Sequence, residues 1–287
     1  MNNLTKIHPF IWFDNQAAQA AKFYCSVFDN SIIINESAMT VSFELDGFFM
    51  VGLNGGPAFK PNPSISFYVL CDSEEEIEIK YKKLKAEGMV MMALDEYAWS
   101  PKYAFIRDKH GVCWQLTLRE PGNDHQKITP SMLFVNQKNG KAEEAMKLYS
   151  SVFKSSEEYA LVKYEKGQGN NEGYVMFSHF KIADFPLMAM DGPREHDFDF
   201  NEGISFVVNT KDQEETDYFW QGLIANGGSE GQCGWLKDPF GVSWQIVPKR
   251  FMELAGDADK AKVQRVMAAM MKMKKFVIED LERAAEA

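Results

Sequence analysis

One ten-residue pattern occurs twice in this chain: RDKHGVCWQL at residues 107–116 and KDPFGVSWQI at residues 237–246. Asp at the first position and Gly at the fourth are preferred in a type I turn, and the second copy adds Pro at the second position. Side chains alternate along the strand that follows. Trp114 and Trp244 are therefore expected on an apolar face, and Gln115 and Gln245 on the opposite face.

Each copy ends a unit of the order β-α-β-β-β. In the first unit, alternation and helical spacing predict a strand at 7–13, a helix at 17–28, and strands near 31–36, 39–45 and 48–53. The second unit begins at Ser64, and its helix opens with the capping box of Ser73 and Glu76. Its last strand is the one that carries Gln115.

The same order restarts after the linker Pro121-Gly122-Asn123-Asp124. The motif Leu-Tyr-x-x-Val-Phe at residues 148–153 matches Phe-Tyr-x-x-Val-Phe at residues 23–28. An internal repeat of this length indicates duplicated domains. We predict domains at residues 1–120 and 125–249, with four βαβββ units in all. Each half is expected to curl its own two units around a shared cleft.

The tail, residues 250–287, departs from the repeat. From about Ala258 to Ala285 it is expected to form one amphipathic helix. Its apolar stripe comprises Val263, Val266, Met270, Met273, Val277 and Leu281. The stripe is expected to dock on the protein's own surface or on a second subunit in a homodimer. A methionine-rich groove for other proteins is the third alternative.

Composition narrows the classes of function. A length of 287 residues suits about two domains, and a net charge of −10 argues against binding to a nucleic-acid backbone. No apolar run is long enough to span a bilayer, and no signal segment is recognised. We therefore expect a cytoplasmic protein with no membrane partner. The four cysteines form no Cys-x-x-Cys pair and are interpreted as small buried or half-buried hydrophobic residues.

Five segments carry a family resemblance: PFIWFDNQAAQAAKFYCSVF, FFMVGLNGGPAF, SISFYV, RDKHGVCWQLTL and GISFVVN with QCGWLKDPFGVSWQIVP. They resemble the PhnB-like branch of the vicinal oxygen chelate superfamily, which includes glyoxalase I, extradiol dioxygenases, and bleomycin and fosfomycin resistance proteins. That branch is often labelled 3-demethylubiquinone-9 3-methyltransferase. The resemblance covers nearly the whole chain. It implies an α+β fold in which tandem glyoxalase-like domains form curved mixed sheets around clefts, followed by a C-terminal helix.

The resemblance also implies where a metal would bind. The ligand positions fall on His8, on or near Met50, and on Ser64 and Gln115 in the first half. In the second half they fall on Thr129, Leu187, Gly203 and Gln245. A catalytic divalent site needs about three ligands from His, Asp, Glu or Cys, and only His8 qualifies. We therefore predict no metal and no other cofactor. Methyl transfer is not supported either, because no glycine-rich loop follows the first strand.

The face opposite the tryptophans is expected to form an apolar pocket with a few polar groups, which suits a small molecule. The predicted ligand-binding residues are His8, Trp12, Ser66, Tyr68, Gln115, Ser205 and Gln245. A pocket built on His8 and Gln115 is favoured, with Trp99, Tyr103 and Trp235 at the rims.

Four functions remain open. The first is a metal-independent small-molecule-binding protein. The second is an enzyme acting on a small oxygenated or aromatic substrate, with His8 as acid/base and the best catalytic candidate, and with Gln115 orienting the substrate. The third is a metal-dependent lyase or dioxygenase. The fourth is an interaction protein that uses its tail.

Overall fold

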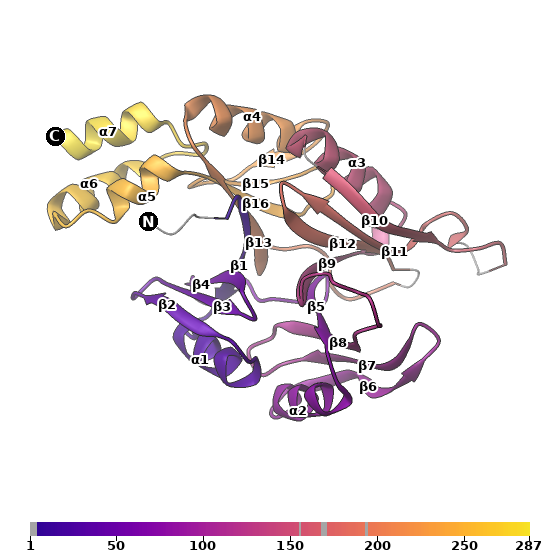
Figure 1. Cartoon of the computed structure of the whole chain (residues 1–287). Coiled ribbons are helices and arrows are strands. Elements are labelled where there is room, and N and C mark those ends of the chain that lie inside the picture. Colours follow the sequence, from indigo (N-terminus) through magenta and orange to yellow (C-terminus); the bar gives the residue numbers. More distant parts are fainter. Residues whose placement is uncertain (1–4, 155, 168–170, 193–194) are drawn as a thin grey trace.

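The computed structural model describes residues 5–154, 156–167, 171–192 and 195–287. It confirms an α+β fold with four βαβββ units, arranged in two mixed sheets of eight strands each (Figure 1). The first unit contains β1 (Ile7–Phe13), α1 (Ala17–Val27), β2 (Ile32–Glu36), β3 (Thr40–Leu45) and β4 (Phe48–Asn54). The second contains β5 (Ile65–Cys71), α2 (Glu74–Leu84), β6 (Met89–Tyr97), β7 (Ser100–Arg107) and β8 (Cys113–Leu118).

The second half repeats this order. The third unit contains β9 (Ile128–Phe134), a 3-10 helix at Asn136–Lys138, α3 (Ala142–Phe153), β10 (Ser156–Lys163), β11 (Val175–Ile182) and β12 (Phe185–Asp191). The fourth contains β13 (Ile204–Thr210), α4 (Gln213–Ile224), β14 (Ser229–Glu230), β15 (Trp235–Lys237) and β16 (Ser243–Pro248). None of the helices in the described residues is long and apolar enough to cross a membrane.

The units pair across the two halves of the chain. Sheet A has the order β14-β15-β16-β13-β1-β4-β3-β2 and joins the first unit to the fourth. Sheet B has the order β10-β11-β12-β9-β5-β8-β7-β6 and joins the second unit to the third. The expectation that each half curls its own two units around a cleft is therefore wrong. Every unit presents an equivalent first strand, so the repeat alone does not specify which unit becomes its neighbour.

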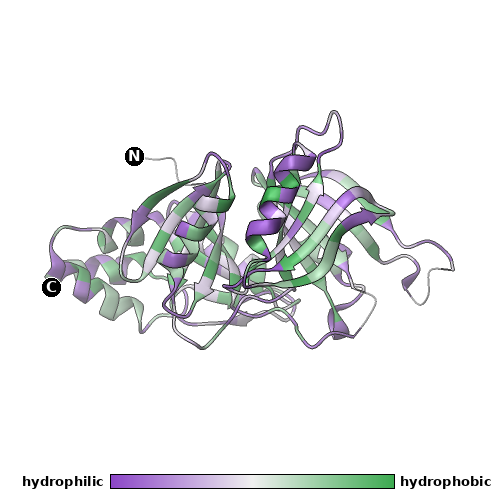
Figure 2. Ribbon diagram, turned by 90° about the horizontal axis from the view of Figure 1, so that it is seen from below, coloured by the Kyte–Doolittle hydropathy of each residue, from purple (hydrophilic) through white to green (hydrophobic). Residues whose placement is uncertain are grey.

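The backs of the two sheets share one continuous apolar core. The Trp114 ring of sheet B lies 5.2 Å from Tyr24 and 4.9 Å from Phe28, at the α1 helix of the first unit. In return, the Trp244 ring of sheet A lies 5.2 Å from the Tyr149 ring of α3. Each sheet's tryptophan is thus packed against a helix that belongs to the other sheet. Figure 2 shows the sheets as two curved layers, with hydrophobic residues along the strands.

The aspartate of each repeated turn holds its tryptophan in place. One carboxylate oxygen of Asp238 accepts from the backbone N–H groups of Phe240 and Val242, and the other from the Trp244 indole (3.0 Å) and the Tyr149 hydroxyl (2.7 Å). Asp108 likewise accepts from two turn N–H groups and from the Trp114 indole at 2.8 Å. Burial raises the pKa of both carboxyls to about 6.

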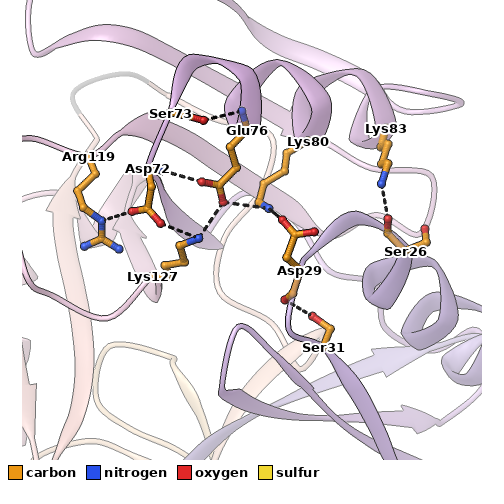
Figure 3. A network of polar contacts seen from close by, with 10 residues as sticks. All are labelled: Ser26, Asp29, Ser31, Asp72, Ser73, Glu76, Lys80, Lys83, Arg119 and Lys127. Carbon is orange, nitrogen blue, oxygen red and sulfur yellow. Dashed lines mark hydrogen bonds and ion pairs between the residues drawn. The ribbon is translucent and has the colours of Figure 1, made fainter.

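A charge network fastens the linker between the halves (Figure 3). Lys127 lies 2.9 Å from carboxylate oxygens of both Asp72 and Glu76. Lys80 is 1% exposed and lies 3.1 Å from Glu76 and 3.7 Å from Asp29 of the first unit. Because Asp29 belongs to the unit in sheet A and Lys80 to the unit in sheet B, the network also crosses between the sheets.

The tail is helical, as expected, but it forms three helices: α5 (Lys249–Ala255), α6 (Lys260–Met270) and α7 (Ile278–Glu286). Between α6 and α7, the Met273 and Lys274 carbonyls accept from the backbone N–H groups of Cys233 and Gly234, at 2.8 and 2.7 Å. These carbonyls are used for contacts outside the tail, so the continuous helix expected over Ala258–Ala285 is interrupted here.

We call the face of each sheet that is turned away from the shared core its inner face. The tail packs on the inner face of sheet A. A second apolar cluster joins two strand residues to the tail and comprises Val207, Val247, Leu254, Val266, Met270, Phe276, Leu281 and Ala285. The stripe residues Val266, Met270 and Leu281 are thus buried on the protein's own surface. A homodimer through the tail stays a prediction.

Tyr149→Phe removes the hydroxyl that donates to Asp238 and keeps the ring. Because Asp238 is buried, we expect the free energy of unfolding in urea to fall by about 1–3 kcal/mol. Tyr174→Phe, at an exposed tyrosine, is the matched control and is expected to lower the free energy of unfolding much less. Equal losses in the two variants would contradict the assigned contact.

Candidate functional site

The structure divides the predicted site residues between two inner faces. His8, Trp12, Ser205 and Gln245 lie in sheet A, whereas Ser66, Tyr68 and Gln115 lie in sheet B. The predicted pocket built on His8 and Gln115 is therefore wrong, because the sheets that carry them stand back to back. The same separation excludes a joint acid/base and orienting pair of His8 with Gln115.

Both inner faces contain the same glutamine–serine pair. The Gln115 amide donates to Ser66 at 2.9 Å, and the Gln245 amide donates to Ser205 at 3.0 Å. On sheet B the Gln115 carbonyl also accepts from the Tyr103 hydroxyl at 2.7 Å. The amide of Gln115 is therefore fixed from both sides, with its carbonyl toward β7 and its NH2 toward β5.

A row of side chains crosses the inner face of sheet B. Strand register places Ser66 opposite Ser131, Ser131 opposite Met188, and Met188 opposite His179. Directly opposed residues share a face of the sheet. The Ser131 hydroxyl and the His179 Nε2 atom are buried and have no hydrogen-bond partner in the described part of the chain. These two polar atoms of the inner face therefore have no protein hydrogen bond within the described residues.

Aromatic rings flank this row. The Tyr68 and Phe177 rings lie 6.5 Å apart, although β9 and β12 separate their strands. At about 4.8 Å per strand, a flat sheet would place those strands about 14 Å apart, so the sheet curves around this face. The His179 ring also lies 4.5 Å from His125 and 5.1 Å from Tyr159.

Of the expected rim residues, Trp99 and Trp235 lie at strand ends, whereas Tyr103 lies within β7 and is buried. Trp99, 60% exposed, stacks 5.1 Å from Tyr97 and lies 5.6 Å from the Tyr103 ring, at the tip of the β6–β7 hairpin. Trp235 lies on sheet A, 6.1 Å from Trp12. Rim functions for these side chains stay a prediction.

Two ionisable groups of the sheet B face, His179 and Cys113, are neutral near pH 7. Burial, together with the neighbouring His125, lowers the pKa of His179 to about 4. Burial raises the pKa of the Cys113 thiol to about 12, so it is a poor nucleophile. Sequence reasoning missed His179 because it concentrated on the first and last strands of each unit, whereas His179 lies on β11. The alternation of His179 with Phe177 along this strand is the sequence signal that could have identified it.

His8 is a buried residue of sheet A. Its Nδ1 atom accepts from the Asn209 side-chain amide at 3.4 Å, and its ring lies 5.0 Å from Phe49. Burial lowers its pKa to about 3, so the imidazole is neutral at ordinary pH. Trp12 donates from its indole to the Gly56 carbonyl at 2.7 Å. These contacts give both side chains structural partners, on the sheet whose inner face the tail covers.

The residues at the metal-ligand positions do not fit a divalent catalytic ion. Met50 and Leu187 are fully buried in the core between the sheets. The inner-face residues of sheet B at this level, Ser66, Ser131 and Met188, offer hydroxyl and thioether groups with no negative charge. Within the described residues, no three His, Cys, Asp or Glu side chains are placed to hold a metal ion. The donor chemistry thus departs from the three-ligand requirement.

Two surface hollows lie outside these faces. One, of about 260 Å³, is lined by α3, β10 and Phe180; the other, of about 220 Å³, lies between the β3–β4 and β11–β12 hairpins. Several of their charged side chains are already paired, since Glu143 contacts Lys147 and Lys163, and Lys6 contacts Glu215. Neither hollow contains a glutamine–serine pair.

The family model described as 3-demethylubiquinone-9 3-methyltransferase matches the chain twice, at residues 5–117 and 126–247. The chain belongs to this PhnB-like family. A PhnB protein of Bacillus cereus is 34% identical and covers 40% of this chain and 99% of its own, with a TM-score of 0.38. Maize (Zea mays) glyoxalase I is 12% identical and covers 88% of this chain and 95% of its own, with a TM-score of 0.58. A search of curated proteins gives no match.

The PhnB-like assignment confirms the resemblance inferred from the turn-and-strand motif. The two matched segments correspond to the two tandem halves, so the whole duplicated architecture belongs to the family. The likeness to glyoxalase I shows the vicinal oxygen chelate fold alone. The family description names a methyl transfer, and the chemistry of this chain's own site has to be argued from its residues.

His8→Gln tests the burial of a neutral imidazole. Between pH 6.5 and about 3 the unfolded chain binds a proton at His8 and the folded chain does not, so acidification destabilises the fold. From pH 7 to pH 5, wild type is expected to lose about 2 kcal/mol more unfolding free energy than the variant. Urea titrations at both pH values measure this difference. Asp108 and Asp238 titrate in both proteins, so their contributions to the difference cancel. Equal losses of unfolding free energy in wild type and variant would contradict a buried, neutral His8.

Proposed function

We propose that this protein binds a small organic molecule on the inner face of sheet B, without a metal ion. The observation that carries the proposal is the hydrogen-bonded chain of Tyr103, Gln115 and Ser66, next to the unpartnered polar atoms of Ser131 and His179. A buried polar atom without a partner costs about 1–3 kcal/mol. A ligand that hydrogen-bonds to Ser131 or His179 removes that cost and is held by the aromatic rings around them.

The tail supports the choice of sheet B over sheet A. On sheet A, Val207 and Val247 flank Gln245 on the inner face and are buried by α5, α6 and α7. On sheet B the corresponding region is flanked by Tyr68, Phe105 and Phe177, none of which is fully buried. An apolar surround with a few fixed polar groups is the usual composition of a small-molecule site.

Binding without a metal is supported by the charge of the donors. The side chains around Gln115 offer hydroxyl, amide and neutral imidazole groups, which suit hydrogen bonds to oxygen atoms of an organic ligand. A catalytic divalent cation would need about three carboxylate, imidazole or thiolate ligands, and the described residues place no such group of three together.

An enzyme acting on a small oxygenated or aromatic substrate is the second candidate. The observation in its favour is His179, whose neutral ring has an unpartnered Nε2 atom on the face that carries Ser131. In this alternative, His179 takes the acid/base function first assigned to His8. Turnover with proton uptake or release that His179→Gln abolishes, while ligand binding is still detected, would favour this candidate over binding alone.

Gln115→Leu and Gln245→Leu form a matched pair, because the same glutamine–serine contact occurs on each sheet. The probe is 2-naphthamide, an uncharged aromatic amide, titrated by calorimetry. Gln115→Leu is expected to weaken its binding about five- to tenfold, since about 1 kcal/mol of hydrogen bonding is lost. Gln245→Leu is expected to leave binding unchanged. Equal effects of the two substitutions, or no binding to wild type, would contradict a site on sheet B.

A further inference from the structure

Arg107 lies on the inner face of sheet B. On β7, Arg107 is opposite Cys113, and Phe105 is opposite Gln115. The intervening residue Ile106 is buried in the core. Because side chains alternate along a strand, Arg107 and Phe105 share the face that carries the glutamine–serine pair. They are two positions apart along the strand, which corresponds to about 7 Å.

The charge of Arg107 is unbalanced within the protein. The chain has a formal net charge of −10, and Arg119, Arg250 and Arg283 each contact a carboxylate. Arg265 donates to two tail carbonyls. No carboxylate of the described residues lies within ion-pair distance of Arg107, and its recorded hydrogen bond is to the Met89 sulfur at 3.8 Å. Most N–H donors of its half-exposed guanidinium therefore have no protein acceptor among the described residues.

Neighbouring charges do not compete for this guanidinium. The Asp108 carboxylate, one residue along, is turned into the core and bonded to the Trp114 indole. Lys109 is paired with Glu87 at 3.1 Å. Lys181, on β11 toward the opposite edge of sheet B, is paired with Glu157 and Asp184. An acidic group entering beside Arg107 would therefore meet an unpaired cation.

We propose that Arg107 binds the anionic group of the ligand, so that the site accepts an aromatic carboxylate in preference to a neutral aromatic molecule. This inference rests on the proposed function, and it adds the charge of the ligand. The guanidinium matches a carboxylate with two parallel hydrogen bonds. With the carboxylate at Arg107, a flat ring lies at the level of Phe105 and Gln115. The remaining polar atoms of the ligand then point toward Ser66 and Ser131.

The test compares two probes of the same shape, 2-naphthoate and 2-naphthamide, by calorimetry with the full-length protein. Wild type is expected to bind 2-naphthoate at least about tenfold more tightly. Arg107→Gln is expected to lower the affinity for 2-naphthoate about ten- to 150-fold, the range for hydrogen bonds to a charged group, and to leave 2-naphthamide unchanged. Arg283→Gln, which removes the same charge from the tail surface, is the matched control and is expected to change neither affinity.

The outcomes separate this inference from the proposed function. If wild type binds both probes equally and Arg107→Gln changes neither, the ligand-charge inference is wrong and the site on sheet B stands. If wild type binds neither probe, both fail. If Arg107→Gln weakens both probes equally, the arginine supports the fold and does not recognise charge. Thermal unfolding of the variant distinguishes that last case, since a recognition residue leaves Tm of the free protein nearly unchanged.

Discussion

The rest of the structure depends on two buried indoles. Trp114 and Trp244 each donate a hydrogen bond to the aspartate of their own turn and pack against helix aromatics that belong to the other sheet. These contacts commit one face of the last strand to the core. Since a strand alternates strictly, the next residue is forced to the inner face. The positions of Gln115 and Gln245 are therefore a consequence of tryptophan burial, and packing in the core determines the geometry of the site.

Local patterns allowed the units to be predicted, because turn chemistry and alternation are properties of short stretches. The i to i+3 bonds from Gly111 to Asp108 and from Gly241 to Asp238 confirm the expected turns, and full burial of both tryptophans confirms the apolar face. Sheet partnership was predicted wrongly, because β1 and β5 carry similar patterns and either is compatible with several neighbours. That error displaced the candidate site, since it joined His8 to Gln115. His179 was missed for a related reason: its proximity to Ser131 exists only after β9, β12 and β11 have paired.

The two sheets have diverged from a common plan. The β6 and β7 strands of the second unit have nine and eight residues, whereas β14 and β15 of the fourth unit have two and three. The tail compensates, as its Met273 and Lys274 carbonyls bond to the backbone beside β15 and Phe276 packs close to Gly234. On sheet B the longer hairpin supplies Tyr103 to Gln115 and Arg107 to the same face. One sheet has thus become a support for the tail, and the other keeps its polar side chains available.

The exchange of units between halves also sets an order in which the protein can be assembled. Sheet B is built from one continuous stretch, β5 to β12, so all of its strands have been synthesised before β13 exists. Sheet A needs both ends of the repeat, and contacts such as Lys6 with Asn209 join residues 203 positions apart. Such non-local pairing is slow, because a long loop must close before the contact stabilises it. The strands that carry the candidate site can therefore pair before the fourth unit, the partner of the first unit, has been synthesised. The tail follows the fourth unit in the chain, so it can cover sheet A only after that unit has paired with the first.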